Sequence, residues 1–165
     1  MQRAAETMVQ ARRSMIGVRP GTLDSSACLR AVELNGQFPA VVVTTTYGAE
    51  SRTQQIEQFA EGRKVERLVG TTPFPPHGGE VLVVSKTLLA TWVDQIIEVK
   101  PKALVILDGQ LGSAGSKFNR GLRKLIAAMS PDDLVIARVI PKDLPHLAEQ
   151  AQMLGAQMPA GAPAR

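Results

Sequence analysis

Short runs of apolar residues alternate along this chain with stretches in which apolar residues recur every three or four positions. Runs of the first kind are typical of strands buried on both faces of a sheet, and stretches of the second kind are typical of amphipathic helices. The runs that predict strands are Met15–Val18, Ala40–Thr46, Lys64–Val69, Val81–Ser85, Ala103–Asp108 and Leu134–Ile140. The stretches that predict helices are Ser26–Leu34, Glu50–Ala60, Thr87–Val99, Lys117–Met129 and Asp143–Leu154.

The alternation of strands and helices predicts the fold class. Parallel strands need crossover connections, which helices usually supply, so this order predicts a single α/β domain with three layers and a mainly parallel sheet. Two segments depart from the alternation. Thr71–Gly79 is rich in proline and glycine and is predicted to be a loop. Residues 156–165 are predicted to form a flexible Pro/Ala/Gly tail that follows a domain of residues 1–155.

Composition narrows the class of protein. Of the 165 residues, 44% are hydrophobic and 21% are charged, as expected of a globular domain with one core. No apolar run approaches the roughly 18 residues that suggest a membrane span, and the charged N-terminal stretch is unlike a secretory signal. The single cysteine, Cys28, excludes an internal disulfide and is expected to be a small buried residue, so we expect a cytoplasmic protein. His77 and His146 lack a second ligand at metal spacing, so neither a metal site nor a cofactor is predicted.

The charge balance permits an anionic partner. The chain has a net charge of +4 and a pI of about 9.6, whereas aromatic residues make up only 4% and argue against a platform for stacking single-stranded bases. Basic residues cluster on the predicted helix that begins at Lys117, opposite its apolar stripe. With basic residues elsewhere they form a candidate surface for phosphates, or simply a solvated face. The set comprises Lys117, Arg120, Arg123 and Lys124, together with Arg12, Arg13, Arg52 and Lys86.

A strand, a Pro-Gly-Thr turn and a helix follow one another without a gap between Ile16 and Val32. In a phosphate-binding P-loop that ends in Gly-Lys-Thr, the lysine would fall at Asp24, the preceding glycine at Leu23 and the hydroxyl at Ser25. At about 4 Å and an effective dielectric near 20, one charge pair is worth roughly 4 kcal/mol, so exchanging attraction for repulsion changes the interaction by up to about 8 kcal/mol. The turn is therefore predicted not to hold a nucleoside triphosphate. As an ordinary turn, it would use Asp24 or Ser25 to cap the helix.

Several segments match one known protein family in order and spacing. Pro20–Ser25 has the length of a P-loop, Val81–Leu89 forms a strand-to-helix segment with a serine at the turn, and Leu104–Asp108 matches a strand that ends in an Asp-Glu box. Over roughly residues 2–155 the chain resembles the first RecA-like lobe of a superfamily-two helicase, most closely the Swi/Snf-type DNA translocases. The resemblance implies a P-loop NTPase-type lobe and a short helix containing Gln2 or Gln10 before the first strand.

The resemblance also implies which chemistry has been lost. The degenerate nucleotide-loop positions are Gly21, Thr22, Asp24, Ser25 and Asp108. Gly109 replaces the glutamate that would polarise the attacking water, and the coupling motif keeps only Pro141. A second lobe, which would supply an arginine finger, is not expected in this chain. The expectation is a pseudo-ATPase without a cofactor, in which Asp108 alternatively serves as a hydrogen-bonded turn residue.

In this family the turns at Thr44–Thr46 and Ser85-Lys86 face nucleic acid. The candidate nucleic-acid-binding residues are therefore Thr44, Lys86, Lys117, Arg120 and Lys124, contacting the phosphate backbone and not reading base sequence. The leading hypothesis is a non-catalytic helicase-like module that binds nucleic acid, a protein partner or both. One alternative is a structural or assembly subunit that forms homo-oligomers or part of a larger particle. Another is half of a two-chain helicase that a partner completes.

Overall fold

The computed structural model describes residues 2–17, 24–45, 49–59, 62–107, 115–139 and 147–156. Within these residues, six strands form one sheet in the order β1-β6-β5-β2-β4-β3, and every pairing between neighbours is parallel. The strands are β1 (Arg13–Gly17), β2 (Ala40–Thr44), β3 (Val65–Leu68), β4 (Val81–Ser85), β5 (Ala103–Ile106) and β6 (Leu134–Val139). The predicted α/β fold with a parallel sheet is confirmed.

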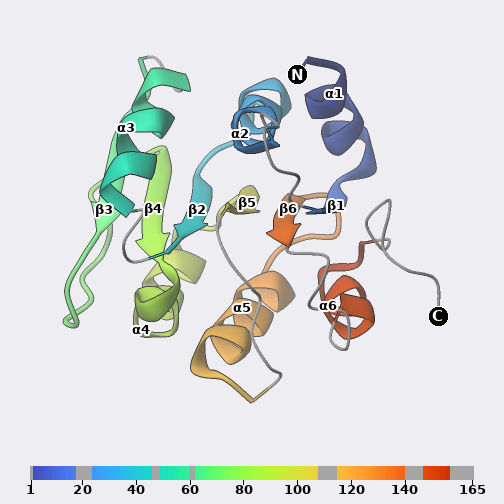
Figure 1. Cartoon of the computed structure of the whole chain (residues 1–165). Coiled ribbons are helices and arrows are strands. Elements are labelled where there is room, and N and C mark those ends of the chain that lie inside the picture. The colour runs from blue at the N-terminus through green and yellow to red at the C-terminus, as the bar shows by residue number, and fades with distance from the viewer. Residues whose placement is uncertain are drawn as a thin grey trace.

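Helices cover both faces of this sheet (Figure 1). The helices are α1 (Gln2–Ala11), α2 (Asp24–Asn35), α3 (Ala49–Phe59), α4 (Lys86–Glu98), α5 (Lys117–Ala128) and α6 (Leu147–Leu154). In Figure 1, α1, α2 and α3 lie above the sheet, and α4, α5 and α6 lie below it. Alternate residues of one strand accordingly enter two cores: Val41 and Val43 pack with Trp92 of α4, whereas Val42 packs with Cys28 of α2.

The structure adjusts several predicted boundaries. The helix predicted to begin at Ser26 begins at Asp24, and the strand predicted over Met15–Val18 begins at Arg13. The helix that only the family resemblance implied is present as α1, where Ala5 and Met8 are buried. At the other end, Ala156 still packs against the core and its amide donates to the carbonyl of Ala151, while residues 157–165 lie outside the described residues.

Close packing of α4 on α5 depends on one glycine. A Cβ built on Gly121 would lie 3.1 Å from the Cα of Ala90 and 3.4 Å from its Cβ. Because few side chains tolerate so short an approach to a backbone atom, a larger residue at this position would push the two helices apart. The glycine thus brings together the N-termini of α4 and α5, which both follow strands of the same sheet.

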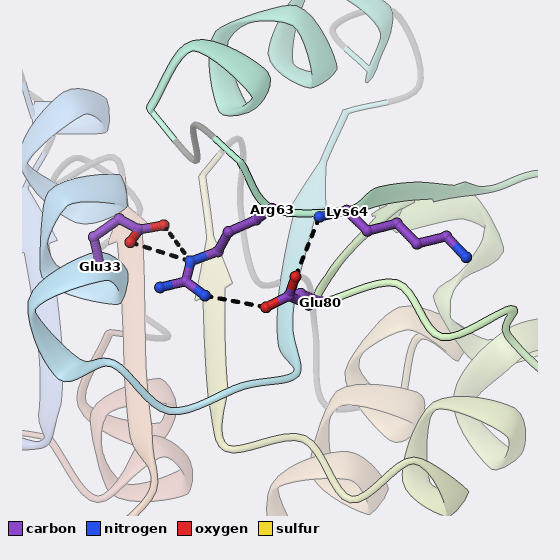
Figure 2. Close-up of polar contacts among 4 residues, drawn as sticks. All are labelled: Glu33, Arg63, Lys64 and Glu80. Atoms are coloured by element: carbon purple, nitrogen blue, oxygen red, sulfur yellow. Dashed lines mark hydrogen bonds and ion pairs between the residues drawn. The ribbon is translucent and has the colours of Figure 1, made fainter.

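Ion pairs organise the edge of the sheet where the strands begin, which we call the amino edge. Figure 2 shows Arg63 between two carboxylates, with Nε 3.0 Å from Glu33 of α2 and Nη1 3.0 Å from Glu80, the residue before β4. The guanidinium also lies 3.8 Å from the centroid of the Phe38 ring. Hydrogen bonds to Glu33 raise the pKa of Arg63, with further contributions from Glu80. This cation is therefore engaged within the domain.

We predict that Gly121→Leu lowers the free energy of unfolding by about 1–3 kcal/mol in a urea titration, because the leucine overpacks the α4–α5 contact. Helix propensity alone would act in the opposite direction by roughly 1 kcal/mol. Ala127→Leu, at an exposed position of the same helix, is the matched control and is expected to change stability by less than about 0.5 kcal/mol. A Gly121→Leu protein as stable as the parent would contradict the packing explanation.

Candidate nucleic-acid interface

The candidate residues gather at the carboxyl edge, where the parallel strands end and the following helices begin. Ligand sites of open parallel sheets usually lie at this edge, because loops and helix N-termini converge there. Among the described residues, Lys86 directly follows β4, and Lys117 begins α5. Both helices lie on the same face of the sheet (Figure 1).

At the start of α4, the serine hydroxyl is not used for capping. Ser85 has an extended backbone and is buried, yet its side chain makes no capping hydrogen bond. Its Oγ has no hydrogen-bond partner within the described part of the chain. A buried hydroxyl without a partner costs free energy, so this position favours a ligand atom or water that can bond to it.

The start of α5 is capped and lies next to the start of α4. The Ser116 side chain accepts a hydrogen bond from the Asn119 amide at 3.1 Å, which satisfies one of the first-turn donors. The Nζ of Lys86 lies 4.9 Å from the ring centroid of Phe118, a cation–π contact that connects the two N-termini. Neither helix has an acidic residue in its first turn, and each begins with a lysine.

A basic stripe continues along α5 from this corner. Lys117, Arg120 and Lys124 share one face, and with a rise of about 1.5 Å per residue they span roughly 10 Å. They line a groove of about 270 Å³ between α4 and α5, whose other lining residues include Val93, Gly121 and Asp94. Lys124 Nζ lies 2.5 Å from Asp94 Oδ1, but both side chains are exposed, so this pair contributes little stability.

The N-terminus of α2 differs from these two. In a P-loop this helix would receive the phosphates, but here it begins with Asp24, and Ser25 is its second residue. Its first turn therefore carries a carboxylate where α4 and α5 carry a lysine. The other degenerate nucleotide-loop positions, Gly21, Thr22 and Asp108, lie outside the described residues.

Two further side chains define the carboxyl edge. Thr44 is fully buried and its hydroxyl donates to the carbonyl of Thr45 at 3.0 Å, so the hydroxyl is not exposed to a ligand. Half-buried Arg138 of β6 donates from Nη1 to the carbonyl of Leu107 at 2.8 Å. Leu107 directly precedes Asp108, and thus a guanidinium lies at the end of the strand that carries the degenerate acidic box. Sequence reasoning did not single out Arg138 as a site residue, because this proximity between β5 and β6 appears only in the fold.

Two arginines grouped with this surface from the sequence are elsewhere. Arg13 is the first residue of β1, and Arg12 precedes it, so both lie at the amino edge. Arg12 Nη1 donates to Asn35 Oδ1 at 2.5 Å, and Arg13 Nη2 donates to the Ser130 carbonyl at 2.7 Å. Burial lowers the pKa of Arg13, and the carboxylate of Asp133 partly offsets the shift. The prediction that Arg12 and Arg13 join the basic surface of α5 was therefore wrong; the side chain of Arg52 lies outside the described residues.

The described residues contain neither a cluster of metal ligands nor a helix that could span a membrane. Among the described residues, no group of three or more His, Cys, Asp and Glu side chains could hold a metal ion. The same residues contain no helix of the length and apolarity required to cross a bilayer. Cys28 is buried, as its position in the predicted helix suggested.

No protein-family model matches the chain, and no curated protein sequence matches it. Several solved structures, however, match the chain. The Sulfolobus solfataricus SWI2/SNF2 ATPase core domain superposes with a TM-score of 0.66 at 14% identity, covering 92% of this chain and 32% of that one. The same core in complex with dsDNA gives a TM-score of 0.62 at 13% identity, covering 84% and 30%.

A third structure, the UvsW helicase from bacteriophage T4, gives a TM-score of 0.58 at 11% identity. It covers 92% of this chain and 55% of the helicase. The present chain thus spans about a third of the two SWI2/SNF2 chains and about half of the UvsW chain. These similarities confirm, at the level of the fold, the resemblance seen in the sequence: the chain has a RecA-like fold, as do the SWI2/SNF2 ATPase core and the UvsW helicase over the matched regions.

Proposed function

We propose that this domain is a non-catalytic, helicase-like module that binds the phosphate backbone of duplex DNA without hydrolysing ATP, alone or together with a protein partner. The observation that carries the proposal is the pair of lysines, Lys86 and Lys117, at adjacent helix N-termini of the carboxyl edge.

This pair of lysines is unfavourable for the isolated helices. The N-terminus of a helix carries a partial positive charge, and a lysine there costs roughly 0.3–1 kcal/mol relative to a favourable acid. A bound phosphate reverses the sign of this effect, because two helix N-termini and two ammonium groups then attract the same anion. Anion binding therefore accounts for residues that helix stability alone would disfavour.

Duplex DNA is the phosphate-bearing partner that the surface fits best. Arg120 and Lys124 extend the positive surface about 10 Å from Lys117, which suits a repeating polyanion better than a single phosphate. Only 4% of the chain is aromatic, which disfavours binding by base stacking. One structurally similar protein, the SWI2/SNF2 ATPase core, was solved in complex with dsDNA.

The non-catalytic part of the proposal is supported by residues at the nucleotide-loop positions. Asp24 begins the helix that would receive phosphates, and its carboxylate opposes them. Gly109 stands where a catalytic glutamate would be needed to position water.

We predict that the double variant Lys86→Gln/Lys117→Gln weakens binding to fluorescent duplex DNA about 50- to 100-fold near 0.1 M salt, measured by anisotropy. The slope of log K against log salt should become shallower by roughly 1.8, since each lost phosphate contact contributes about 0.9. ATP should change neither value.

The matched control is Lys100→Gln/Lys102→Gln, which removes the same charge from exposed side chains at the amino edge, just before β5. It should lower affinity less than about threefold through net charge alone. If both double variants lose the same affinity for duplex DNA, Lys86 and Lys117 contribute only through net charge, and the proposed interface is contradicted. Absence of DNA binding at low salt, with a mass that rises with concentration in light scattering, would instead favour the assembly-subunit alternative.

A second variant is expected to act in the opposite direction. Asp94→Asn removes the carboxylate that lies 2.5 Å from Lys124 at the rim of the α4–α5 groove. Duplex affinity should increase about three- to tenfold, because a repulsive charge disappears and Lys124 becomes available to a phosphate. An unchanged affinity in the same anisotropy assay would show that Lys124 does not contact the DNA.

The purified chain is expected to release no phosphate from ATP above the protein-free rate, with or without duplex DNA. The reason is the carboxylate at Asp24 together with the loss of the water-positioning glutamate at Gly109. A phosphate-release assay provides the measurement. Hydrolysis that disappears in an Asp108→Ala variant would contradict the non-catalytic proposal and favour a helicase that a second lobe completes.

A further inference from the structure

β3 forms one edge of the sheet, and none of the described strands lies on its outer side. On the inner side it pairs with β4 in the register Val65↔Val81, and the amide of Val81 donates to the carbonyl of Lys64 at 3.1 Å. Alternate residues of a parallel strand bond to the same neighbour, so the even-numbered residues of β3 face β4. The backbone amides and carbonyls of Val65 and Arg67 therefore point away from the sheet.

The two edges of the sheet differ in exposure. At the opposite edge, Met15 at the centre of β1 is only 6% exposed, and the other residues of that strand are half-buried. In β3, by contrast, Arg67 is exposed and Val65 is half-buried, and Val69, directly after the strand, is 50% exposed. Figure 1 shows β3 as the outermost strand on the side of β4. An open strand edge is a template for pairing with another chain, and here that edge is β3.

Contacts within the domain hold β3 in its extended conformation. The side chain of Leu68 is buried in the core, and the Glu66 carboxylate accepts a hydrogen bond from the amide of His77 at 2.9 Å. These contacts involve the inner side of the strand and one of its faces, and they leave its outer backbone groups available. Because the strand is already ordered, pairing with it requires little further loss of conformational entropy on the side of this domain.

Charge and hydrophobicity define the kind of strand that fits this edge. Val65 and Arg67 share one face of β3, and Val69 continues the same alternation. Arg67 has no ion pair among the described residues. Residues directly opposite one another on paired strands have neighbouring side chains on the same face. A partner strand with a carboxylate between two apolar residues would therefore match all three positions.

A second copy of this chain fits the edge less well. Antiparallel pairing over the full length of β3 would place Arg67 opposite Arg67 of the copy, and like charges at directly opposite positions are destabilising. The charge at the centre of the edge thus disfavours self-pairing and favours an acidic partner.

We propose that β3 is a docking edge for an extended acidic segment of a protein partner, in which a carboxylate residue lies between apolar residues. The segment would extend the sheet by one strand, with main-chain hydrogen bonds to Val65 and Arg67 and an ion pair to the Arg67 guanidinium. This interaction goes beyond the proposed DNA binding and uses neither Lys86 nor Lys117.

The test titrates the isotope-labelled full chain with two peptides blocked at both ends, Thr-Val-Glu-Val-Thr and Thr-Val-Lys-Val-Thr, and follows backbone amides by NMR. The glutamate peptide should give saturable shifts centred on Val65 and Arg67 and slow the exchange of these two amides with solvent about fivefold. The amides of Glu66 and Leu68, which already face β4, should keep their exchange rates. The lysine peptide should bind about tenfold more weakly.

A charge reversal on the domain provides the second arm of the test. Arg67→Glu should invert the preference, weakening binding of the glutamate peptide about tenfold and strengthening binding of the lysine peptide by a similar factor. The matched control is Lys102→Glu, which changes the net charge equally at an exposed residue of the amino edge and should alter either affinity less than about twofold.

Three results would overturn the proposal: no saturable binding of the glutamate peptide, shifts centred away from β3, or an unchanged preference in Arg67→Glu. Duplex DNA affinity should be equal in Arg67→Glu and Lys102→Glu, so failure of the peptide test leaves the DNA proposal standing. A selective loss of duplex binding in Arg67→Glu would instead assign this edge to DNA and contradict a protein partner there.

Discussion

Burial of the central strands on both faces constrains where this domain can carry function. Every residue of β2, β4 and β5 is buried, so the helices must cover both faces and polar chemistry is confined to the two edges and the outer helix surfaces. The amino edge is occupied by internal ion pairs such as Glu33–Arg63–Glu80. The carboxyl edge instead presents lysines at the N-termini of α4 and α5, held together by the close approach of Gly121 to Ala90.

In this domain the helices that begin with lysines are α4 and α5, whereas a P-loop protein binds phosphate at the N-terminus of the helix that corresponds to α2. The first residue of α2 is acidic, Asp24, whereas α4 and α5 begin with lysines, whose charge adds to the positive end of each helix dipole. In the proposed role, phosphate would bind on the face of the sheet that α4 and α5 cover and not on the face that α2 covers. A RecA-like lobe that has exchanged nucleotide binding for backbone binding would have this charge distribution, and the sheet that supports both uses need not change.

Much of the fold was predictable from the sequence because continuous apolar runs specify doubly buried strands. The helix over Lys117–Ala128 was predictable for the same kind of reason, since its apolar stripe is regular. Features that depend on contacts between distant residues were not. Three such features could be found only once the order of the strands in the sheet was known. They are the burial of Thr44, the position of Arg13 at the amino edge and the contact between Lys86 and Phe118. The proline-rich segment Thr71–Gly79 lies outside the helices and strands, as predicted, but its contacts with Glu66 and Trp92 join residues distant in the sequence and were not predicted.

The most direct measurement is a backbone amide NMR titration of the labelled chain with a short duplex DNA, with and without Mg-ATP. If the N-termini of α4 and α5 form the interface, the largest shifts will fall at Lys86, Thr87, Ser116 and Lys117, and Mg-ATP will leave them unchanged. Shifts centred on the start of α2 near Ser26, or shifts at the carboxyl edge caused by Mg-ATP alone, would show that this lobe still binds nucleotide and would contradict the proposed role.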